Sequence, residues 1–333
     1  MSLETSVQYR VNDTLNGAPA EYRTPEERPT LEEAKEWCHR LATSHYENFH
    51  VATFFLPKRV RPHFESVYAF CRVSDDLGDE VGDTATGMRL LRTWDEMLDQ
   101  CYDRPEWSRH PVFVALAETI RSCSIPKEPF ADLLTAFRQD QTVTRYATME
   151  DVLQYCRYSA NPVGRLVLYA CGEADEEKFR LSDATCSALQ LANFWQDVDR
   201  DLDKGRIYIP IDVMKKYGLT DADLVKRQFD TRYVHMMKDI VSRTRSLFAA
   251  GAPLARRLAP DIRLDIELFT SAGVAVLDGI EAVSYDTLHR RPVVSRAAKA
   301  RMLTRAMLSR VRLVFRPVPV DDARKTTLAK RHA

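Results

Sequence analysis

The chain of 333 residues has no excess charge of either sign, since its 48 lysines and arginines balance its 48 aspartates and glutamates. This balance excludes the strongly basic surface of a general polyanion-binding protein, and we expect no nucleic-acid partner. The sequence shows no N-terminal secretion signal and no apolar run near the roughly 20 residues of a membrane span. Its seven cysteines lack CxxC or metal-finger spacing. Such dispersed thiols favour a reducing, cytoplasmic location.

Glycine is scarce, at 11 residues, and no alternating strand pattern stands out. The sequence contains no GxSxG, HExxH, GxGxxG or P-loop pattern. Nothing therefore points to a serine hydrolase, a zinc protease or a nucleotide-binding enzyme.

Helical patterns fill most of the chain, and we predict a single all-α domain because no break divides the helices into two groups. Residues 1–29 are polar and predict a flexible leader, residues 30–316 form the predicted domain, and residues 317–333 form a basic tail. The expected helices span about 31–46, 58–81, 85–102, 109–122, 127–140, 149–171, 176–203, 231–257, 260–289 and 295–314.

A stripe of polar residues lies on the predicted helix 58–81, within a largely apolar segment. Tyr68, Arg72, Asp75 and Asp79 are spaced four, three and four residues apart, so they share one helix face. A solvated acidic face is the simpler interpretation of a lone Asp-x-x-x-Asp pair. However, acids four residues apart repel, and Gly78 costs about 1 kcal/mol relative to alanine in a helix. A bound cation would convert that repulsion into attraction.

A second stripe lies about 120 residues further on, in the predicted helix 176–203. It consists of Gln190, Asn193, Asp197 and Asp201, and is followed by Lys204, Arg206 and Tyr208. An ordinary charged helix end would account for the neighbouring charges but not for the aligned stripe. Asn193 offers a neutral oxygen or an N–H donor, and Arg206 is suited to clamping a phosphate.

Two acidic helix faces turned toward each other would form an oxygen-lined slot for a hard cation. Mg²⁺ keeps some of its water and takes remaining ligands from carboxylates and substrate phosphates. The sequence therefore predicts a diphosphate site with Asp75, Asp79, Asp197 and Asp201 as metal ligands.

These motifs resemble those of the squalene/phytoene synthase family, all-α enzymes that join or rearrange prenyl diphosphates. The resemblance covers about residues 38–315 and implies an isoprenoid-synthase helical bundle around a central cavity. It implies catalytic roles for Tyr68, Arg72 and Tyr208, and Mg²⁺ as the cofactor. Substrate contacts are implied for His45, Phe49, Arg72, Gln190, Asn193, Arg206 and Arg291.

Three segments look like the hydroxysqualene synthase group in particular. They are HYENF at 45–49, YCRYSANPVGRL at 155–166 and NFWQDV at 193–198. This group ionises presqualene diphosphate, captures the cation with water to form hydroxysqualene for hopanoid synthesis, and requires no NADPH. Position 273 is glycine where some relatives have a tyrosine facing the cavity.

Two alternatives remain open. The first is a condensing synthase that makes presqualene diphosphate, dehydrosqualene or phytoene from farnesyl or geranylgeranyl diphosphate. The second is a non-catalytic assembly factor of the same fold, although such relatives have eroded aspartate motifs and both motifs are intact here.

The carbocation chemistry requires aromatic faces and a held water molecule. The candidate aromatic residues are Phe49, Phe54, Tyr68, Phe137, Tyr158 and Phe194. Pro162 interrupts a helical pattern, and we hypothesise that Asn161 or Ser159 at the disturbed turn, or Glu47, holds the water. A purely structural kink explains the same proline equally well.

The segment 295–315 is a basic amphipathic helix. It suits either the last core helix or peripheral contact with anionic lipid at the inner face of a membrane. We also expect functional coupling to other squalene-pathway enzymes, because the substrate and product are oily.

Overall fold

The computed structural model describes residues 15–44, 56–294 and Thr304. These residues form a helical domain, which confirms the all-α prediction; the one β-bridge among them joins Arg145 and Ile207. Two short 3₁₀ helices are Ala20–Tyr22 (η1) and Pro105–Trp107 (η2). The α-helices are Leu31–Ser44 (α1), Arg61–Asp79 (α3), Thr84–Asp103 (α4), Pro111–Cys123 (α5), Glu128–Asp140 (α6), Met149–Ser159 (α7), Asn161–Cys171 (α8), Glu176–Gln196 (α9), Val198–Asp203 (α10), Ile211–Lys216 (α11), Asp221–Val225 (α12), Thr231–Gly251 (α13), Leu254–Arg257 (α14) and Pro260–Ala282 (α15).

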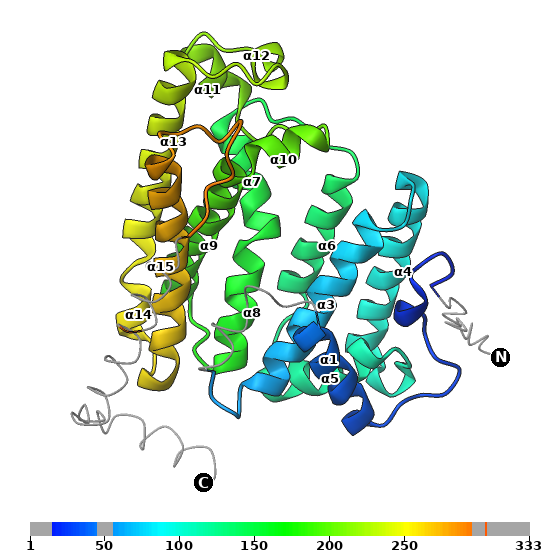
Figure 1. Cartoon of the computed structure of the whole chain (residues 1–333). Helices are drawn as coiled ribbons and strands as arrows, with labels where there is room; N and C mark the ends of the chain where they lie inside the picture. Colours follow the sequence, from blue (N-terminus) through cyan, green and yellow to red (C-terminus); the bar gives the residue numbers. More distant parts are fainter. Residues whose placement is uncertain (1–14, 45–55, 295–303, 305–333) are drawn as a thin grey trace, which may run out of the picture.

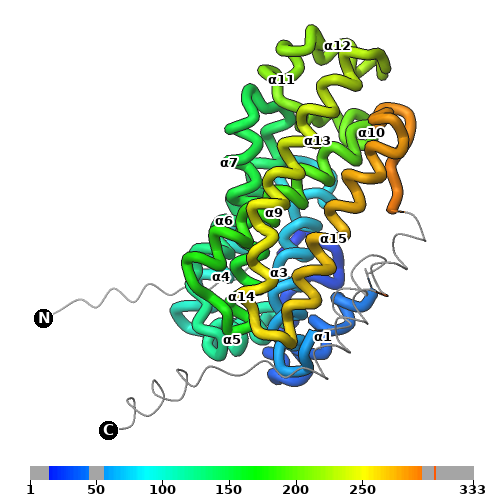
Figure 2. The backbone as a smooth tube through the Cα atoms, turned by 90° about the vertical axis from the view of Figure 1, so that its left-hand side faces the viewer, coloured from blue at the N-terminus to red at the C-terminus, as the bar shows by residue number. Residues whose placement is uncertain are grey.

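The long helices run roughly along one direction, and α11 and α12 project at one end of the bundle (Figures 1 and 2). One apolar core lies among α1, α3, α4, α5 and α6, and includes Phe70 and Trp94. A second lies among α7, α9, α13 and α15, and includes Trp195 and Tyr233. Helix α8 packs against both α3 and α9 and so joins the two halves.

Side-chain caps fix where several helices begin. The Asp83 carboxylate accepts a hydrogen bond from the Thr86 amide at the start of α4, and Thr148 forms a reciprocal capping box at the start of α7. Such caps satisfy amide groups that have no partner within the helix. Gly172, with φ of 71°, ends α8 in the left-handed conformation that glycine adopts without strain.

Three predicted long helices are divided in the structure, and one of them, 231–257, breaks after Gly251, where α13 ends before α14 begins at Leu254. The pattern over 149–171 breaks at Ala160, where Pro162 occupies the first turn of α8, as its missing N–H allows. The pattern over 176–203 is interrupted at Asp197, which ends α9 and precedes α10. The sequence reading also missed the short helices α11 and α12. Such short elements carry too few apolar residues to show a period.

Residues 15–29 differ from the expected flexible leader, because they pack against the domain. Leu15 and Tyr22 are buried, and the Tyr22 carbonyl accepts a hydrogen bond from His110. We call residues 15–30 the strap. The strap therefore belongs to the folded domain. A polar composition hid the few apolar anchors that hold it there.

Gly273 lies in the interface of α15 with α9 and α13 rather than facing open space. A Cβ atom at this position would lie 2.4 Å from Phe248 and 2.6 Å from Leu189. The absence of a side chain thus permits close helix packing, and the structure has no room for a tyrosine here.

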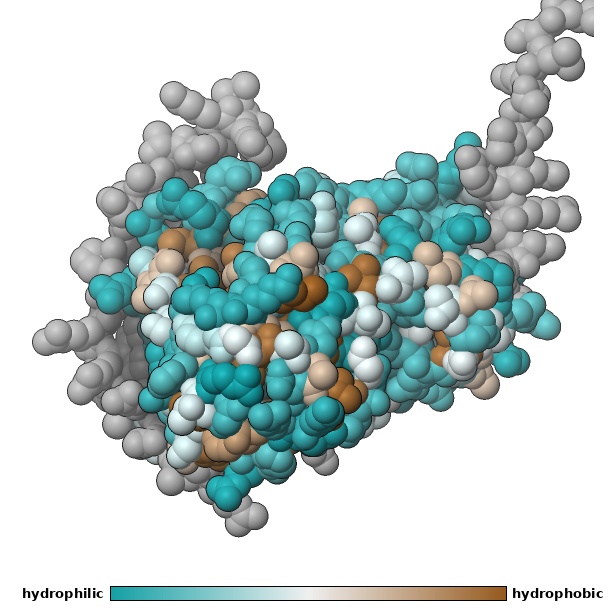
Figure 3. All heavy atoms as spheres, turned by 90° about the horizontal axis from the view of Figure 1, so that it is seen from above, coloured by the Kyte–Doolittle hydropathy of each residue, from teal (hydrophilic) through white to brown (hydrophobic). Residues whose placement is uncertain are grey.

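Seen from the end that carries α11 and α12, the described surface is mostly hydrophilic with scattered apolar residues (Figure 3). Within the described residues, no helix combines the length and apolar character needed to cross a bilayer. The predicted helix 295–314 lies outside the described residues apart from Thr304.

Candidate active site

The first acidic stripe occupies the C-terminal half of α3. The Asp75 and Asp79 side chains are 51% and 39% exposed, whereas Asp76 between them is 2% exposed and faces the core. Arg72 lies one turn earlier, and its guanidinium binds the Asp76 carboxylate through two contacts of 2.5 and 2.9 Å. The nearest Arg72 and Asp75 atoms are 3.9 Å apart. The same side of α3 therefore carries the carboxylates of Asp75 and Asp79 and one end of the Arg72 guanidinium.

The second stripe keeps its helical register through the junction of α9 and α10. The Asp197 amide donates to the Asn193 carbonyl, and the Asp201 amide donates to the Asp197 carbonyl, both at 2.9 Å. These i to i−4 bonds keep all three residues on one face. Arg291 binds the Asp197 carboxylate through contacts of 2.5 and 3.1 Å.

Arg206 connects the two stripes. Its guanidinium lies 3.6 Å from the Asp79 carboxylate and donates to the Asp140 carbonyl at 3.2 Å. Its backbone amide donates to the Asp201 carbonyl at 2.8 Å. The C-terminal end of α3 and the segment after α10 therefore lie at the same end of the bundle (Figure 1). This contact brings the end of α3 beside a segment that lies about 120 residues further along the chain.

Burial and, after it, neighbouring like charges raise the pKa values of three acids in this region. Burial, and then the neighbouring Asp197 carboxylate, raise the pKa of Asp201 to about 7. Although half of the Asp75 side chain is exposed, the surrounding protein and then Asp79 raise its pKa to about 6. Burial also raises the pKa of Asp140 to about 6, with Asp75 and Asp79 adding to the shift. Burial, with the like charges adding to it, therefore disfavours the ionised form of all three acids.

An aromatic cluster lies beside the second stripe. Phe194 and Tyr208 are stacked face to face, with ring centroids 3.7 Å apart, and Tyr155 and Tyr146 lie within about 6 Å of Tyr208. The Tyr155 hydroxyl donates to the Asp140 carboxylate at 2.9 Å. Phe194, Tyr208, Asp201 and Arg206 also line a small recess of about 10 Å³. Apolar rings and charged groups thus meet along one boundary.

Arg145 holds the segment that carries Arg206 and Tyr208. Its guanidinium donates to the carbonyls of Ile207 and Ile209 at 3.2 and 2.5 Å. It also binds the Asp221 carboxylate of α12 at 2.7 Å. One side chain therefore joins α12, the β-bridge and the end of the second stripe.

The structure gives fewer contacts for the other residues that the sequence predicted to form the site. Tyr68 is half-buried on α3, and burial raises its pKa. Gln190 is half-buried and Asn193 is exposed on α9. Asn161 is buried and accepts a hydrogen bond from Ser187 of α9 at 2.9 Å, which ties α8 to α9. His45 and Phe49 lie outside the described residues, as do Glu47 and Phe54.

Sequence reasoning missed Asp140, Tyr155 and Arg145. Tyr155 opens the segment YCRYSANPVGRL, so the resemblance pointed to its neighbourhood. Asp140 and Arg145 stand in no acidic or basic pattern. Asp140 comes here through the packing of α6, and Arg145 through its β-bridge with Ile207. Such isolated charges carry no signal in a single sequence.

The donor set fits a divalent cation. Within the described ranges, no three His, Cys, Asp or Glu side chains form a ready metal cage. Two pairs of carboxylates are nonetheless the kind of oxygen donor that Mg²⁺ takes when substrate phosphates and water complete its shell.

Comparison with known proteins agrees with this geometry. The squalene/phytoene synthase family profile matches residues 17–298. A solved squalene synthase, HpnC from Alicyclobacillus acidocaldarius, is 42% identical with a TM-score of 0.73, covering 82% of this chain and 99% of that one. Hydroxysqualene synthase from Rhodopseudomonas palustris is 35% identical over 67% of this chain and 74% of its own length. Phytoene synthase from Arthrospira platensis is 28% identical over 86% of this chain and 95% of its own length.

Proposed function

Because this chain belongs to the squalene/phytoene synthase family, a family of isoprenoid synthases, we propose that it converts presqualene diphosphate to hydroxysqualene. The carbon–oxygen bond to the diphosphate breaks, and diphosphate leaves with the bonding electrons. A water oxygen then bonds to the carbocation and loses a proton. The similarity to a named hydroxysqualene synthase and the local motifs support this reaction over others in the family.

The observation that carries the proposal is the contact of Arg206 with Asp79, which brings the first acidic pair beside the segment that follows the second pair, together with the arginines that contact these acids. Asp75, Asp79, Asp197 and Asp201 would hold Mg²⁺, which, when bound, acts as a Lewis acid toward the leaving diphosphate. The arginines around the pairs, Arg72, Arg206 and Arg291, donate hydrogen bonds to the diphosphate oxygens. Charge develops on the leaving group, and these groups stabilise it without rearranging.

The aromatic rings next to the acids serve the carbocation. The rings of Phe194, Tyr208 and Tyr155 are buried at the boundary of the charged region, and we propose that the π faces left free by the stacking turn toward the substrate. These faces stabilise a cation, and the packed rings exclude bulk water.

We place the capturing water at the break between α7 and α8. The Ser159 hydroxyl is buried and has no hydrogen-bond partner among the described atoms, and Asn161 stands at the start of α8. A buried hydroxyl without a partner is a suitable anchor for a water molecule. Asn161→Ala leaving the yield and position of the alcohol unchanged would remove Asn161 from this role.

Product analysis tests the proposal. The purified protein is incubated with presqualene diphosphate and Mg²⁺ in the absence of NADPH, and separately with farnesyl diphosphate alone. We expect hydroxysqualene and inorganic diphosphate in the first reaction and unconsumed substrate in the second. Consumption of farnesyl diphosphate, with no alcohol from presqualene diphosphate, would overturn the proposal.

That outcome would favour the condensing alternative. The long coverage of the Arthrospira platensis phytoene synthase supports this second candidate. Release of diphosphate from neither substrate would favour a non-catalytic assembly role. We further propose a cytoplasmic protein that contacts the inner membrane face and works with other squalene-pathway enzymes.

A further inference from the structure

The strap places a tyrosine hydroxyl on the first acidic motif. The Tyr22 hydroxyl donates to the Asp76 carboxylate at 2.5 Å, across 54 residues of sequence. Tyr22 is 1% exposed, and its carbonyl accepts a hydrogen bond from His110 at 3.1 Å. The ring also meets the edge of Trp37. Both the backbone and the ring of Tyr22 are therefore held in place, and this fixes the hydrogen bond to Asp76.

Asp76 in turn fixes Arg72. One Asp76 oxygen accepts from Tyr22 and from Arg72 Nε at 2.9 Å, and the other contacts Arg72 Nη2 at 2.5 Å. The Asp76 carboxylate thus has three donor groups of the protein around it. A planar guanidinium bound through two nitrogens cannot rotate freely. Its remaining nitrogen, Nη1, lies 3.9 Å from Asp75, on the acidic face.

The rest of the strap is held to the domain by backbone carbonyls. Arg109 donates to the Glu26 carbonyl at 3.1 Å, and Arg28 donates to the Ser108 carbonyl at 2.9 Å.

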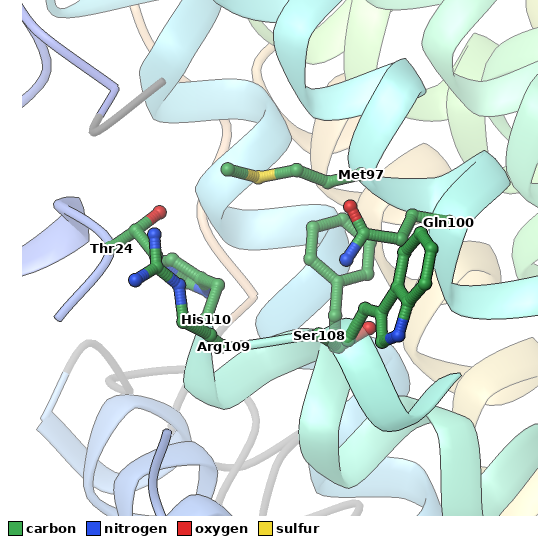
Figure 4. Close-up of a pocket in the computed structure, with 8 residues that line it drawn as sticks. Thr24, Met97, Gln100, Ser108, Arg109 and His110 are labelled. Atoms are coloured by element: carbon green, nitrogen blue, oxygen red, sulfur yellow. The ribbon is translucent and has the colours of Figure 1, made fainter. Parts of the chain in front are cut away.

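Next to these bonds, a pocket of about 30 Å³ remains between the strap, α4 and the start of α5. Figure 4 shows Thr24 beside His110 and Arg109, with Met97 and Gln100 of α4 also lining the pocket. The Thr24 hydroxyl has no partner among the described atoms. The contact that links the strap to the first acidic motif is the hydrogen bond from Tyr22 to Asp76.

We propose that Tyr22 is a positioning residue, through which the strap orients Arg72 toward a bound diphosphate. This inference rests on the proposed function, since Arg72 is assigned there to the diphosphate. Tyr22 touches neither of the carboxylate pairs, so its effect must pass through Asp76 and Arg72. The strap is then part of the catalytic apparatus and not an appendage.

Binding of inorganic pyrophosphate in the presence of Mg²⁺, measured by titration calorimetry, tests this inference. Tyr22→Phe keeps the ring and removes the hydroxyl, and we expect roughly 5- to 20-fold weaker binding because a hydrogen bond to a buried carboxylate is lost. The matched control is Tyr102→Phe, which removes another tyrosine hydroxyl bond, to the Ile125 carbonyl at 3.1 Å. The control should bind pyrophosphate like the wild type.

A double-mutant cycle separates positioning from general stability. Arg72→Lys abolishes the two-nitrogen contact, so adding Tyr22→Phe to it should weaken binding no further. Full additivity, or Tyr22→Phe binding within about twofold of wild type, would overturn the inference. If Tyr22→Phe does not fold, Asp76→Asn replaces it, with Tyr102→Phe again as the control. This variant changes the carboxylate that accepts the Tyr22 hydrogen bond.

The wild type provides the check on the underlying function. If it binds no pyrophosphate and releases none from presqualene or farnesyl diphosphate, the proposed function fails. If it does both while Tyr22→Phe is unaffected, the strap inference alone fails.

Discussion

Replacing Asp201 with asparagine should stabilise the metal-free protein while weakening its function. The pKa of Asp201 is raised from its ordinary 3.8 to about 7, first by burial and then by Asp197. Because the folded pKa is the higher one, the folded state binds more protons between these two values. Stability therefore falls as pH rises from about 4 to about 7, and the full cost remains above pH 7.

The magnitude follows from the same shift. A difference between 3.8 and about 7 corresponds to about 4 kcal/mol at about 1.36 kcal/mol per pKa unit. Asp201 is only half-buried, so solvent screening reduces this to about 1–3 kcal/mol. A neutral amide avoids that cost, and we expect Tm at pH 8 in EDTA to rise by roughly 1–4 °C.

Thermal unfolding at several pH values, together with Mg²⁺-pyrophosphate titration, measures both effects. The gain in Tm should shrink as pH falls and vanish near pH 4, whereas pyrophosphate binding at pH 8 should weaken about tenfold or more. The control is Asp199→Asn on the same short helix, which removes an ion pair with Arg227 at 2.6 Å and should not raise Tm. A lower Tm for Asp201→Asn at pH 8 would refute the reasoning.

Three further predictions concern the scaffold. Burial lowers the pKa of His110 from 6.5 to about 4, so the unfolded state binds more protons between these values. The protein should therefore lose about 3 kcal/mol between pH 6.5 and 4, a loss that denaturant unfolding should find much smaller in His110→Gln. Gly273→Ala should cost about 1–3 kcal/mol or more because the new methyl group overlaps Phe248; an unchanged midpoint in urea would contradict this packing. Arg145→Ala should lower kcat by about tenfold or more because residues 206–209 lose their anchor, and Arg145→Lys should not restore it, since lysine lacks the planar fork; wild-type kcat in the lysine variant would exclude this role.

The residues of the two acidic stripes were identifiable from spacing alone. Asp75 and Asp79, like Asp197 and Asp201, lie four residues apart, and a helix necessarily stacks such residues on one face. The resemblance added Arg291, which lies beside Asp197 in the structure. Local periodicity carries this information because it depends only on neighbours in the chain.

Site residues that lie outside the two stripes could not be predicted from spacing. Tyr22 and Asp140 stand in polar stretches without a period, and their partners lie 54 and 15 residues away. The strap was expected to be flexible because its composition is polar. Three buried anchors, Leu15, Ala18 and Tyr22, are too few to produce a pattern.

By itself the sequence determined the helical class and the chemistry of the two acidic faces, since both follow from residue type and short spacing. Only the tertiary structure decided that Arg206 spans from one stripe to the other, that Asp197 marks a junction between α9 and α10, and that Tyr22 completes the shell around Asp76. These features arise from packing between distant segments, and packing depends on the shapes of all the helices together.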